Sequence, residues 1–282
     1  HPGSRSCRRH LSPQDPIVRL LYAARTDVGM IRSGNEDNYS AVADAVRGLF
    51  IVADGMGGHA AGEVASEMAV QILEVQLRDV RALEDNAVDR KVMTALKGAN
   101  QAIHERTLSE VDKQGMGTTA SVLLMAGRTY LIGQVGDSRV YMLRDGALKQ
   151  LTKDHSYVQE QVDAGFLTPE QARYHPYSNV ITRCVGASPE VEPDIYRGEI
   201  RVGDVFLVAS DGLTGMVDDR RLQQLLLSRA EPEQKVVKLI SEANGRGGLD
   251  NITAIVVEVA ELDAKAGETP TDGIPIQPRP NE

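Results

Sequence analysis

The stretch Phe50-Ile51-Val52-Ala53-Asp54-Gly55 joins a short apolar run to an acidic residue and a glycine. Runs of this length that are rich in β-branched and aromatic residues predict a buried strand. A carboxylate at the end of such a strand is held rigidly where the backbone leaves the core, and the glycine lets the backbone approach its neighbours closely. The stretch therefore predicts a sheet with a fixed carboxylate at one edge.

Acidic residues recur in this setting along the chain. Two more apolar runs end in an aspartate, another aspartate precedes a strand-like run, and an acidic pair completes the set: Gln134-Val135-Gly136-Asp137-Ser138, Leu207-Val208-Ala209-Ser210-Asp211-Gly212, Asp250-Asn251-Ile252-Thr253 and Glu36-Asp37. Carboxylates gathered at one sheet edge would repel one another, and divalent cations remove that conflict. A ligand set of oxygen atoms alone favours Mg²⁺ or Mn²⁺. Asp-Gly and Asp-Ser are also ordinary turn residues, but their recurrence favours a site for several metal ions.

The rest of the pattern predicts an α+β fold. Further strand-like runs lie at residues 120–124, 130–135, 140–143, 205–209 and 252–257. The turn Arg144-Asp145-Gly146-Ala147 is typical of a hairpin, which indicates antiparallel pairing. Apolar residues at helical spacing predict helices at 63–77, 90–111, 218–227 and 233–243. Because these helices come in pairs and do not alternate with strands, a doubly wound parallel sheet is not expected.

The composition narrows the class of protein. The chain has 282 residues, 41% hydrophobic and 4% aromatic, which suits one large unit with an aliphatic core. Lys and Arg total 31 against 40 for Asp and Glu, a net charge of -9, so no nucleic-acid partner is expected. The two cysteines, Cys7 and Cys184, exclude a disulfide framework and a paired-cysteine zinc site. No apolar run approaches the length of a membrane span, and a cytoplasmic location is expected.

Both ends of the chain differ in composition from the middle. Residues 1–16 combine prolines with arginines and predict a flexible basic arm, or alternatively an interaction tail. Residues 263–282 hold four prolines and two glycines, which predicts a disordered tail or a linker to a further domain or membrane anchor. The folded unit is therefore expected at residues 17–262.

Seven motifs stand in a familiar order between Ala23 and Val259. They are Arg-Ser-Gly-Asn-Glu-Asp at 32–37, Asp-Gly-Met-Gly-Gly-His at 54–59, Gly-Thr-Thr at 117–119, Val-Gly-Asp-Ser-Arg at 135–139, Asp-His at 154–155, Ala-Ser-Asp-Gly-Leu at 209–213 and Asp-Asn-Ile-Thr at 250–253. On these motifs the chain resembles the PPM family, the type 2C metal-dependent protein phosphatases, and most closely its bacterial branch. The resemblance implies a four-layer αββα sandwich with two central antiparallel sheets flanked by helices.

The resemblance also implies an activity. The enzyme would hydrolyse phosphoserine and phosphothreonine in proteins with a water activated by metal ions, without a phosphoenzyme, and so oppose Ser/Thr kinases. Two core ions, Mn²⁺ or Mg²⁺, and a third ion are expected, and the protein is expected to be a monomer. The alternative is a catalytically weak phosphatase fold that serves as a regulatory or binding protein.

Each site residue takes an expected role from the resemblance. Asp54 would bridge two ions, Asp211 and Asp250 would complete the first ion's site, and Asp137 with Asp211 would hold the third. The Gly55 carbonyl would bind the second ion, together with Glu36 or Asp37 acting directly or through water. Arg32 would bind the substrate phosphate. Asn251 would support Asp250.

The chain departs from the family's pattern at one histidine, and one further segment is a candidate flap. Many eukaryotic relatives have a candidate general-acid histidine directly after the Asp-Gly, where this chain has Met56, and its nearest histidine is His59. His59 could take the acid role or simply bond locally at a helix start, and His155 is expected to be structural. Residues 156–180 would form a flap beside the metals, or alternatively a plain surface hairpin, with Thr168 and Pro169 starting its second helix.

Two rival enzyme classes lack their signatures. Gly136-Asp137-Ser138 is not part of the Gly-x-Ser-x-Gly turn that a serine hydrolase of the common α/β type needs. Gly55-Met56-Gly57-Gly58 lacks the Lys-Ser/Thr that completes a phosphate-binding P-loop. The metal-dependent phosphatase is therefore the function that the sequence favours.

Overall fold

The two central sheets of the protein are antiparallel throughout. The structure, a computed structural model, describes residues 17–58 and 60–263. One sheet has the order β1-β11-β10-β7-β8, with β1 Val18–Asp27, β11 Ile252–Leu262, β10 Val205–Ala209, β7 Arg139–Arg144 and β8 Ala147–Gln150. The other has the order β2-β3-β5-β6-β9, with β2 Asp37–Ala43, β3 Arg47–Met56, β5 Ala120–Ala126, β6 Thr129–Val135 and β9 Asp194–Glu199, and the short β4 Gly117–Thr118 pairs with β3.

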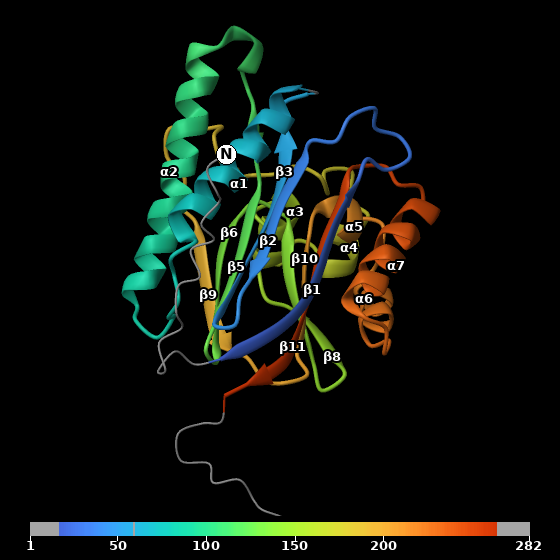
Figure 1. Ribbon diagram of the computed structural model, residues 1–282. Coiled ribbons are helices and arrows are strands. Elements are labelled where there is room, and N and C mark those ends of the chain that lie inside the picture. The colour runs from blue at the N-terminus through green and yellow to red at the C-terminus, as the bar shows by residue number, and fades with distance from the viewer. Residues whose placement is uncertain (1–16, 59, 264–282) are drawn as a thin grey trace, which may run out of the picture.

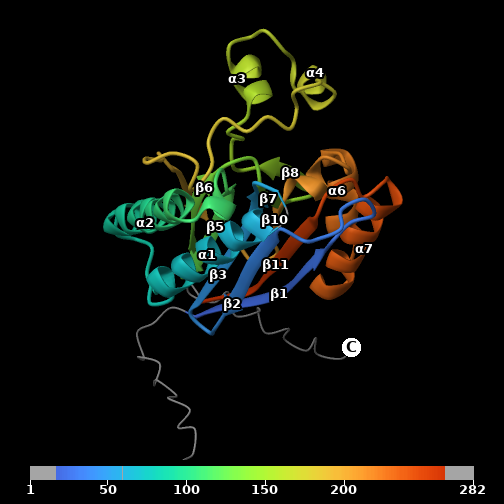
Figure 2. The same cartoon turned by 90° about the horizontal axis from the view of Figure 1, so that it is seen from above.

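Helices cover the outer face of each sheet, as Figure 1 shows. α1 (Ala60–Leu77) and α2 (Ala87–Ser109) pack on the β2-to-β9 sheet, and the short 3₁₀ turn η1 (Val111–Lys113) follows α2. α5 (Asp211–Thr214), α6 (Asp219–Leu226) and α7 (Pro232–Gly245) pack on the other sheet. The expected four-layer αββα sandwich is therefore confirmed. The two remaining helices, α3 (Tyr157–Asp163) and α4 (Pro169–Arg173), stand out from these layers in Figure 2.

Alternation along β3 explains why its sequence is a continuous apolar run. Phe50 and Val52 belong to the core between the two sheets, whereas Leu49, Ile51 and Ala53 belong to the core under α1 and α2. Successive side chains of a strand point to opposite faces, and both faces of β3 are covered, so every position is apolar. Two of the three phenylalanines, Phe50 and Phe206, fill the layer between the sheets.

The helix and strand boundaries differ modestly from the predicted ones. The predicted helix at 90–111 begins earlier and ends at Ser109, and the predicted strand at 205–209 is confirmed as it stands. Strands β1, β2 and β9 were not predicted, because each leaves many of its side chains partly or fully exposed and so lacks a continuous apolar run. His59, the N-terminal arm at 1–16 and all but the first residue of the expected tail lie outside the described residues.

The segment expected as a flap does form two short helices. The Ser156 hydroxyl accepts a hydrogen bond from Gln159 N–H and caps α3. Thr168 and Gln171 form a capping box at the start of α4, with Pro169 as its first residue. The predicted start of the second helix at Thr168 and Pro169 is therefore confirmed.

Candidate active site

Asp54 and Asp37 lie opposite each other on neighbouring strands. The register of β2 and β3 pairs these two residues directly, and side chains so paired are close neighbours on the same face. Asp54 does not end its strand, as the sequence suggested, because β4 pairs with Gly55 and Met56 and extends β3 to Met56.

The Asp54 backbone is fixed by the Gly-Thr-Thr motif. Thr119 Oγ1 accepts a hydrogen bond from Asp54 N–H at 2.9 Å. Asp54 C=O accepts hydrogen bonds from Thr119 N–H at 2.9 Å and from Thr118 Oγ1 at 3.0 Å. The motif thus holds Asp54 in place, a role that its sequence alone does not indicate.

Three further aspartates come from the same end of the other strands. Asp211 begins α5 immediately after β10, Asp250 stands two residues before β11, and Asp137 lies two residues after β6. Gly136 has a φ of 101°, a conformation that favours glycine, and it places Asp137 in the turn before β7. Both sheets thus contribute carboxylates to one end of the sandwich.

Burial and mutual repulsion disfavour the ionised form of these carboxylates. Burial raises the pKa of Asp54 well above its ordinary value, and the charges of Asp37, Asp211 and Asp137 raise it further. The pKa values of Asp137 and Asp211 are also raised, first by burial and then by neighbouring aspartates. Burial raises the pKa of Asp37 to about 7, although hydrogen bonds from Thr253 and Ser210 act to lower it. A positive partner would relieve all four groups.

Oxygen atoms in this cluster lack a donor within the described residues. Oδ1 of Asp37, Asp137 and Asp211 is buried and accepts no hydrogen bond there, whereas buried carboxylate oxygens ordinarily have a donor or a cation. Within residues 17–58 and 60–263, no group of three or more acidic, histidine or cysteine side chains lies close enough to hold a metal ion without further ligands. Mg²⁺ usually keeps several waters as ligands, so these unpartnered oxygens fit hydrated divalent cations.

Gly55 and Gly62 let the backbone and Glu36 approach this cluster. A Cβ on Gly55 would lie 2.1 Å from the Gly62 carbonyl oxygen. A Cβ on Gly62, in the first turn of α1, would lie 1.9 Å from Glu36 Oε2 and 2.9 Å from the Gly55 carbonyl carbon. The Glu36 carboxylate therefore lies in a space that only glycine leaves open.

Gly62→Ala is expected to weaken Mn²⁺ binding on the Gly55 side by about 10–100-fold, the usual cost of disturbing the supports of metal ligands. The added methyl would displace Glu36 and press on Gly55. Gly98→Ala in α2 is the matched control, since its Cβ would meet only the flexible Gln76 side chain at 3.4 Å. Titration calorimetry with Mn²⁺ measures both variants, and unchanged affinity in Gly62→Ala would contradict this role for the glycine.

Arg32 lies at the rim of the cluster. Its Nη2 forms an ion pair with Asp250 Oδ2 at 2.7 Å, and half of its side chain is exposed. The loop that carries Arg32 is fastened by Asn251, whose Nδ2 donates to the Val28 and Gly34 carbonyls at 2.9 Å. Asn251 supports Asp250 through its backbone N–H, which donates to Asp250 Oδ1 at 2.8 Å.

His155 holds the turn that carries Asp137. Its Nδ1 accepts a hydrogen bond from Gly136 N–H at 3.0 Å, and its Nε2 lies 3.1 Å from Asp194 Oδ2. Arg183 pairs with the same Asp194 at 2.9 Å, and burial lowers the pKa of His155. The structural role expected for His155 agrees with these contacts, whereas Asp194 and Arg183 carried no sequence signal because β9 was not predicted.

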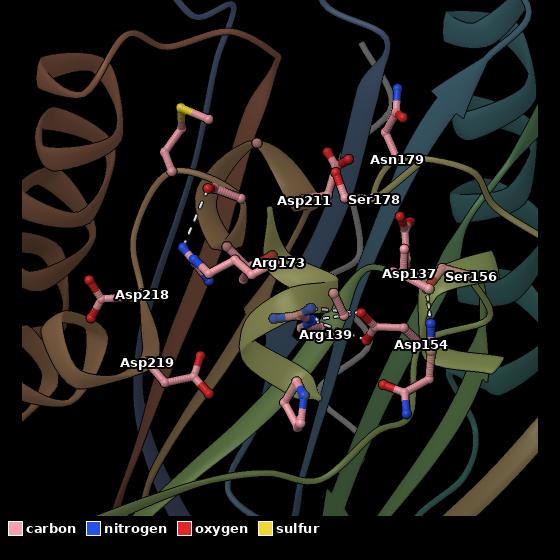
Figure 3. Close-up of a pocket in the computed structure, with 18 of the residues that line it drawn as sticks. Asp137, Arg139, Asp154, Ser156, Arg173, Ser178, Asn179, Asp211, Asp218 and Asp219 are labelled. Atoms are coloured by element: carbon pink, nitrogen blue, oxygen red, sulfur yellow. Dashed lines mark hydrogen bonds and ion pairs between the residues drawn. The ribbon is translucent and has the colours of Figure 1, made fainter. Parts of the chain in front are cut away.

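Arg139 forms a second support that the sequence did not reveal. It makes three hydrogen bonds of 2.7–3.0 Å to the buried Asp154 carboxylate, a pair visible in Figure 3. Its Nη1 also donates to the Tyr141 hydroxyl at 2.9 Å. The charge of Arg139 acts against burial and lowers the pKa of Asp137 and Asp211. Its place as the last residue of the Val-Gly-Asp-Ser-Arg motif was the only available signal.

A cavity of about 840 Å³ opens beside the carboxylates. Arg32, Asp137, Asp211 and Asp250 line it together with residues of the flap helices. Figure 3 shows Asp137 and Asp211 with Arg173 of the flap among these residues. Arg173 in α4 donates to the Gly215 carbonyl at 3.4 Å and joins the flap to the turn after α5. The cavity is therefore a candidate substrate cleft between the acidic cluster and the flap.

Chelated protein is expected to lose thermal stability as the pH rises from about 5 to about 7.5. Because burial raises the pKa of Asp37 to about 7 from 3.8, the folded state binds more protons than the unfolded state in this window. Added Mn²⁺ should therefore raise the melting temperature more at the higher pH, where protons compete less for the ligands. Calorimetric scans measure this, and a pH slope no smaller in Asp37→Asn than in wild type would contradict it.

The chain belongs to the protein phosphatase 2C family, whose sequence pattern matches residues 31–242. Serine/threonine protein phosphatase PstP of Mycobacterium tuberculosis is 42% identical over 244 residues, which cover 86% of this chain and 46% of PstP. The chain thus spans about half the length of that relative. Protein phosphatase PhpP of Streptococcus pneumoniae is 40% identical over 241 residues, 85% of this chain and 98% of PhpP.

Solved structures with a similar fold include the same relative, PstP. A crystal structure of the PstP catalytic domain in complex with two manganese ions superimposes with a TM-score of 0.75 at 41% identity, and covers 86% of this chain and 99% of that one. The expected resemblance to bacterial PPM phosphatases is therefore confirmed. Within residues 17–58 and 60–263, no helix has the length and apolar character needed to cross a bilayer.

Proposed function

We propose that this chain is a metal-dependent protein serine/threonine phosphatase. The observation that carries the proposal is the set of buried, mutually repelling aspartates, with unpartnered oxygens, beside a cavity that Arg32 also lines. Phosphoserine and phosphothreonine proteins are the proposed substrates, so the enzyme would oppose Ser/Thr kinases. The PstP and PhpP relatives, named as protein phosphatases, support this assignment.

The proposed ions are Mn²⁺ or Mg²⁺, two in the core of the site and a third near Asp137. When bound, such ions supply an activated water and offset charge on the phosphoryl group. Asp54 would lie between the two core ions, with Asp211 and Asp250 on one side and the Gly55 carbonyl, with Glu36 or Asp37, on the other. Asp137 and Asp211 would hold the third, where Oδ1 of each is buried and accepts no hydrogen bond from the part of the chain that the structure describes.

Arg32 is proposed to bind the substrate phosphate. Its guanidinium is half exposed at the cavity wall, and planar N–H donors suit phosphoryl oxygens. The loop that carries it is fixed by Asn251, so little motion is lost when it binds. His59 remains a candidate proton donor to the leaving group by its sequence position alone.

The proposal also covers the extent of the catalytic unit, the oligomeric state and the cellular location. The catalytic unit is proposed to span residues 17–262 with a flap at about 156–180, and the protein is proposed to act as a cytoplasmic monomer. Every carboxylate expected in the metal site is present, which favours an active enzyme over a catalytically weak binding protein.

The test is a phosphate-release assay on a phosphothreonine peptide, with and without excess chelator. The proposal expects hydrolysis in Mn²⁺ or Mg²⁺ and none in chelator, with recovery when the ion is restored. Full activity in chelator would exclude the metal mechanism. Absence of any hydrolysis with either ion would favour the binding-protein alternative.

Asp137→Ala is expected to retain two tightly bound ions while turnover falls about 10–100-fold. Asp137 lies far from Asp54 and Asp250 in the sequence, and its proposed ion would position a water that protonates the leaving oxygen. An aryl phosphate needs less protonation on leaving than a phosphoserine does, so the defect should be smaller on the aryl substrate. Metal counting by mass spectrometry and parallel assays on both substrates measure this. An equal loss on the two substrates, or loss of all the ions, would contradict the assignment.

A further inference from the structure

Large aliphatic side chains stand exposed around the Arg32–Asp250 ion pair. Ile31 directly precedes Arg32 and is 67% exposed, and Leu249 directly precedes Asp250 and is 56% exposed. Met30, next to Ile31, is 66% exposed. Each charged member of the pair is thus accompanied by an uncovered aliphatic residue, and we call Met30, Ile31 and Leu249 the apolar rim.

The two loops that carry the apolar rim are packed against each other. Met30 N–H donates to the Gly248 carbonyl at 2.8 Å. A Cβ on Gly248 would lie 2.8 Å from Met30 Cγ, and a Cβ on Gly29 would lie 2.2 Å from the Asp250 carbonyl oxygen. Both glycines have positive φ, 81° at Gly29 and 50° at Gly248. The close backbone approach therefore depends on glycine, and it places Met30 beside residues 248–249.

Side-chain hydrogen bonds make this surface rigid. Asn251 ties the ends of the 28–34 loop at Val28 and Gly34. Asp27 Oδ1 accepts hydrogen bonds from Gly29 N–H at 2.9 Å and from Asn244 Nδ2 at 3.1 Å. A surface held this way loses little conformational entropy when a ligand covers it, so the exposed side chains form a preorganised contact.

The apolar rim is continuous with the candidate substrate cleft. Leu249 lines the 840 Å³ cavity together with Arg32 and Asp250. The cavity is also lined by charged groups, among them Glu170 and Asp218, and by apolar side chains of the flap, among them Val158 and Val162. A polypeptide with its phosphate on Arg32 therefore has the aliphatic side chain of Leu249 directly beside it.

We propose that the apolar rim binds an aliphatic or aromatic side chain of the phosphoprotein substrate, close in sequence to the phosphorylated residue. This inference rests on the proposed function. It defines a substrate class: phosphoserine and phosphothreonine segments with an apolar flanking residue. The preference for an apolar flanking residue arises because its contact with the rim removes apolar surface from water. The fixed spacing between Leu249 and Arg32 determines how far in sequence that residue lies from the phosphorylated one.

The test is a set of phosphothreonine peptides in which one leucine is moved through the three positions on each side, in a serine and glycine background. Wild type is expected to show a kcat/KM about 5–10-fold higher for leucine at one or more positions, the effect of partly burying one aliphatic side chain. Leu249→Ser and Ile31→Ser should reduce that preference to about 2-fold or less. Leu249→Met, which keeps an apolar side chain, should retain it.

Two controls separate this contact from other effects. Val202, in the turn before β10 at the end remote from Asp211, is 59% exposed, so Val202→Ser makes a matched change away from the cleft and should retain the full preference. p-Nitrophenyl phosphate has no flanking residues. The ratio of peptide to aryl-phosphate kcat/KM should therefore fall in the rim variants when the leucine peptide is used.

Three outcomes would overturn the proposal. Wild type could show no preference for leucine at any position, or both serine variants could retain the preference. Light scattering could instead show a wild-type dimer that Leu249→Ser dissociates without any peptide preference, which would assign the rim to a second copy of the chain. Absence of hydrolysis of every substrate would be a different result, because it overturns the proposed function and the rim proposal with it.

Discussion

Asp54→Asn is expected to reduce turnover by at least about 100-fold, since even the outer supports of metal ligands are worth 10–100-fold. Asp54 interacts electrostatically with Asp37, Asp211 and Asp137. A ligand placed between two ions serves both of them. The amide keeps the shape of the side chain and removes its charge, so phosphate release with Mn²⁺ measures the loss directly.

The same variant separates loss of catalysis from loss of folding. Because burial raises the pKa of Asp54, its neutral replacement should leave the chelated protein at least as stable as chelated wild type. Asp145→Asn is the matched control, since Asp145 lies in the β7–β8 turn with a φ of 50° that asparagine also tolerates. An Asp54→Asn protein with half of the wild-type turnover would show that Asp54 does not lie between the ions.

Arg139→Met is expected to lower the free energy of unfolding by about 3–5 kcal/mol, the cost of leaving a buried charge without its partner. The Asp154 side chain is 9% exposed, and Arg139 donates three hydrogen bonds to it. After the substitution, Gln150 Nε2, at 2.9 Å, is the other side-chain donor that remains within the described residues. Denaturant unfolding of both proteins in chelator measures the difference apart from metal binding.

A double variant tests the origin of that loss. Arg139→Met with Asp154→Leu removes both charges and should recover much of the stability, because an apolar pair can replace a buried ion pair. Arg25→Met is the control for an exposed pair, since Arg25 and Glu233 are both more than half exposed, and it should cost less than about 1 kcal/mol. If Arg139→Met were no less stable than Arg25→Met, the Asp154 pair would not support the site.

The fold was predictable where both faces of a strand are covered. β3, β5 and β10 read as apolar runs because the helices cover one face and the opposite sheet covers the other. β1, β2 and β9 escaped prediction because many of their side chains are exposed to solvent. Local sequence therefore signals a central strand far better than one with an uncovered face.

The residues of the candidate site were likewise predictable only where the local sequence signals them. Asp54, Asp137, Asp211 and Asp250 were predictable because each stands beside an apolar run, whereas Asp37 begins β2, which has none. Their supports were not, because the partners meet only in the folded chain: Thr119 reaches Asp54 across 65 residues, and His155 reaches Asp194 across 39. The apolar rim likewise forms only when Gly248 brings Leu249 beside Met30.

The central claim is that Asp54 lies between two divalent cations, and anomalous diffraction from crystals grown with Mn²⁺ tests it most directly. The account predicts two strong anomalous peaks, each within about 2.5 Å of an Asp54 carboxylate oxygen. One should also contact Asp211 and Asp250, and the other should contact the Gly55 carbonyl. Anomalous peaks elsewhere in the protein, with none within that distance of Asp54, would contradict the account.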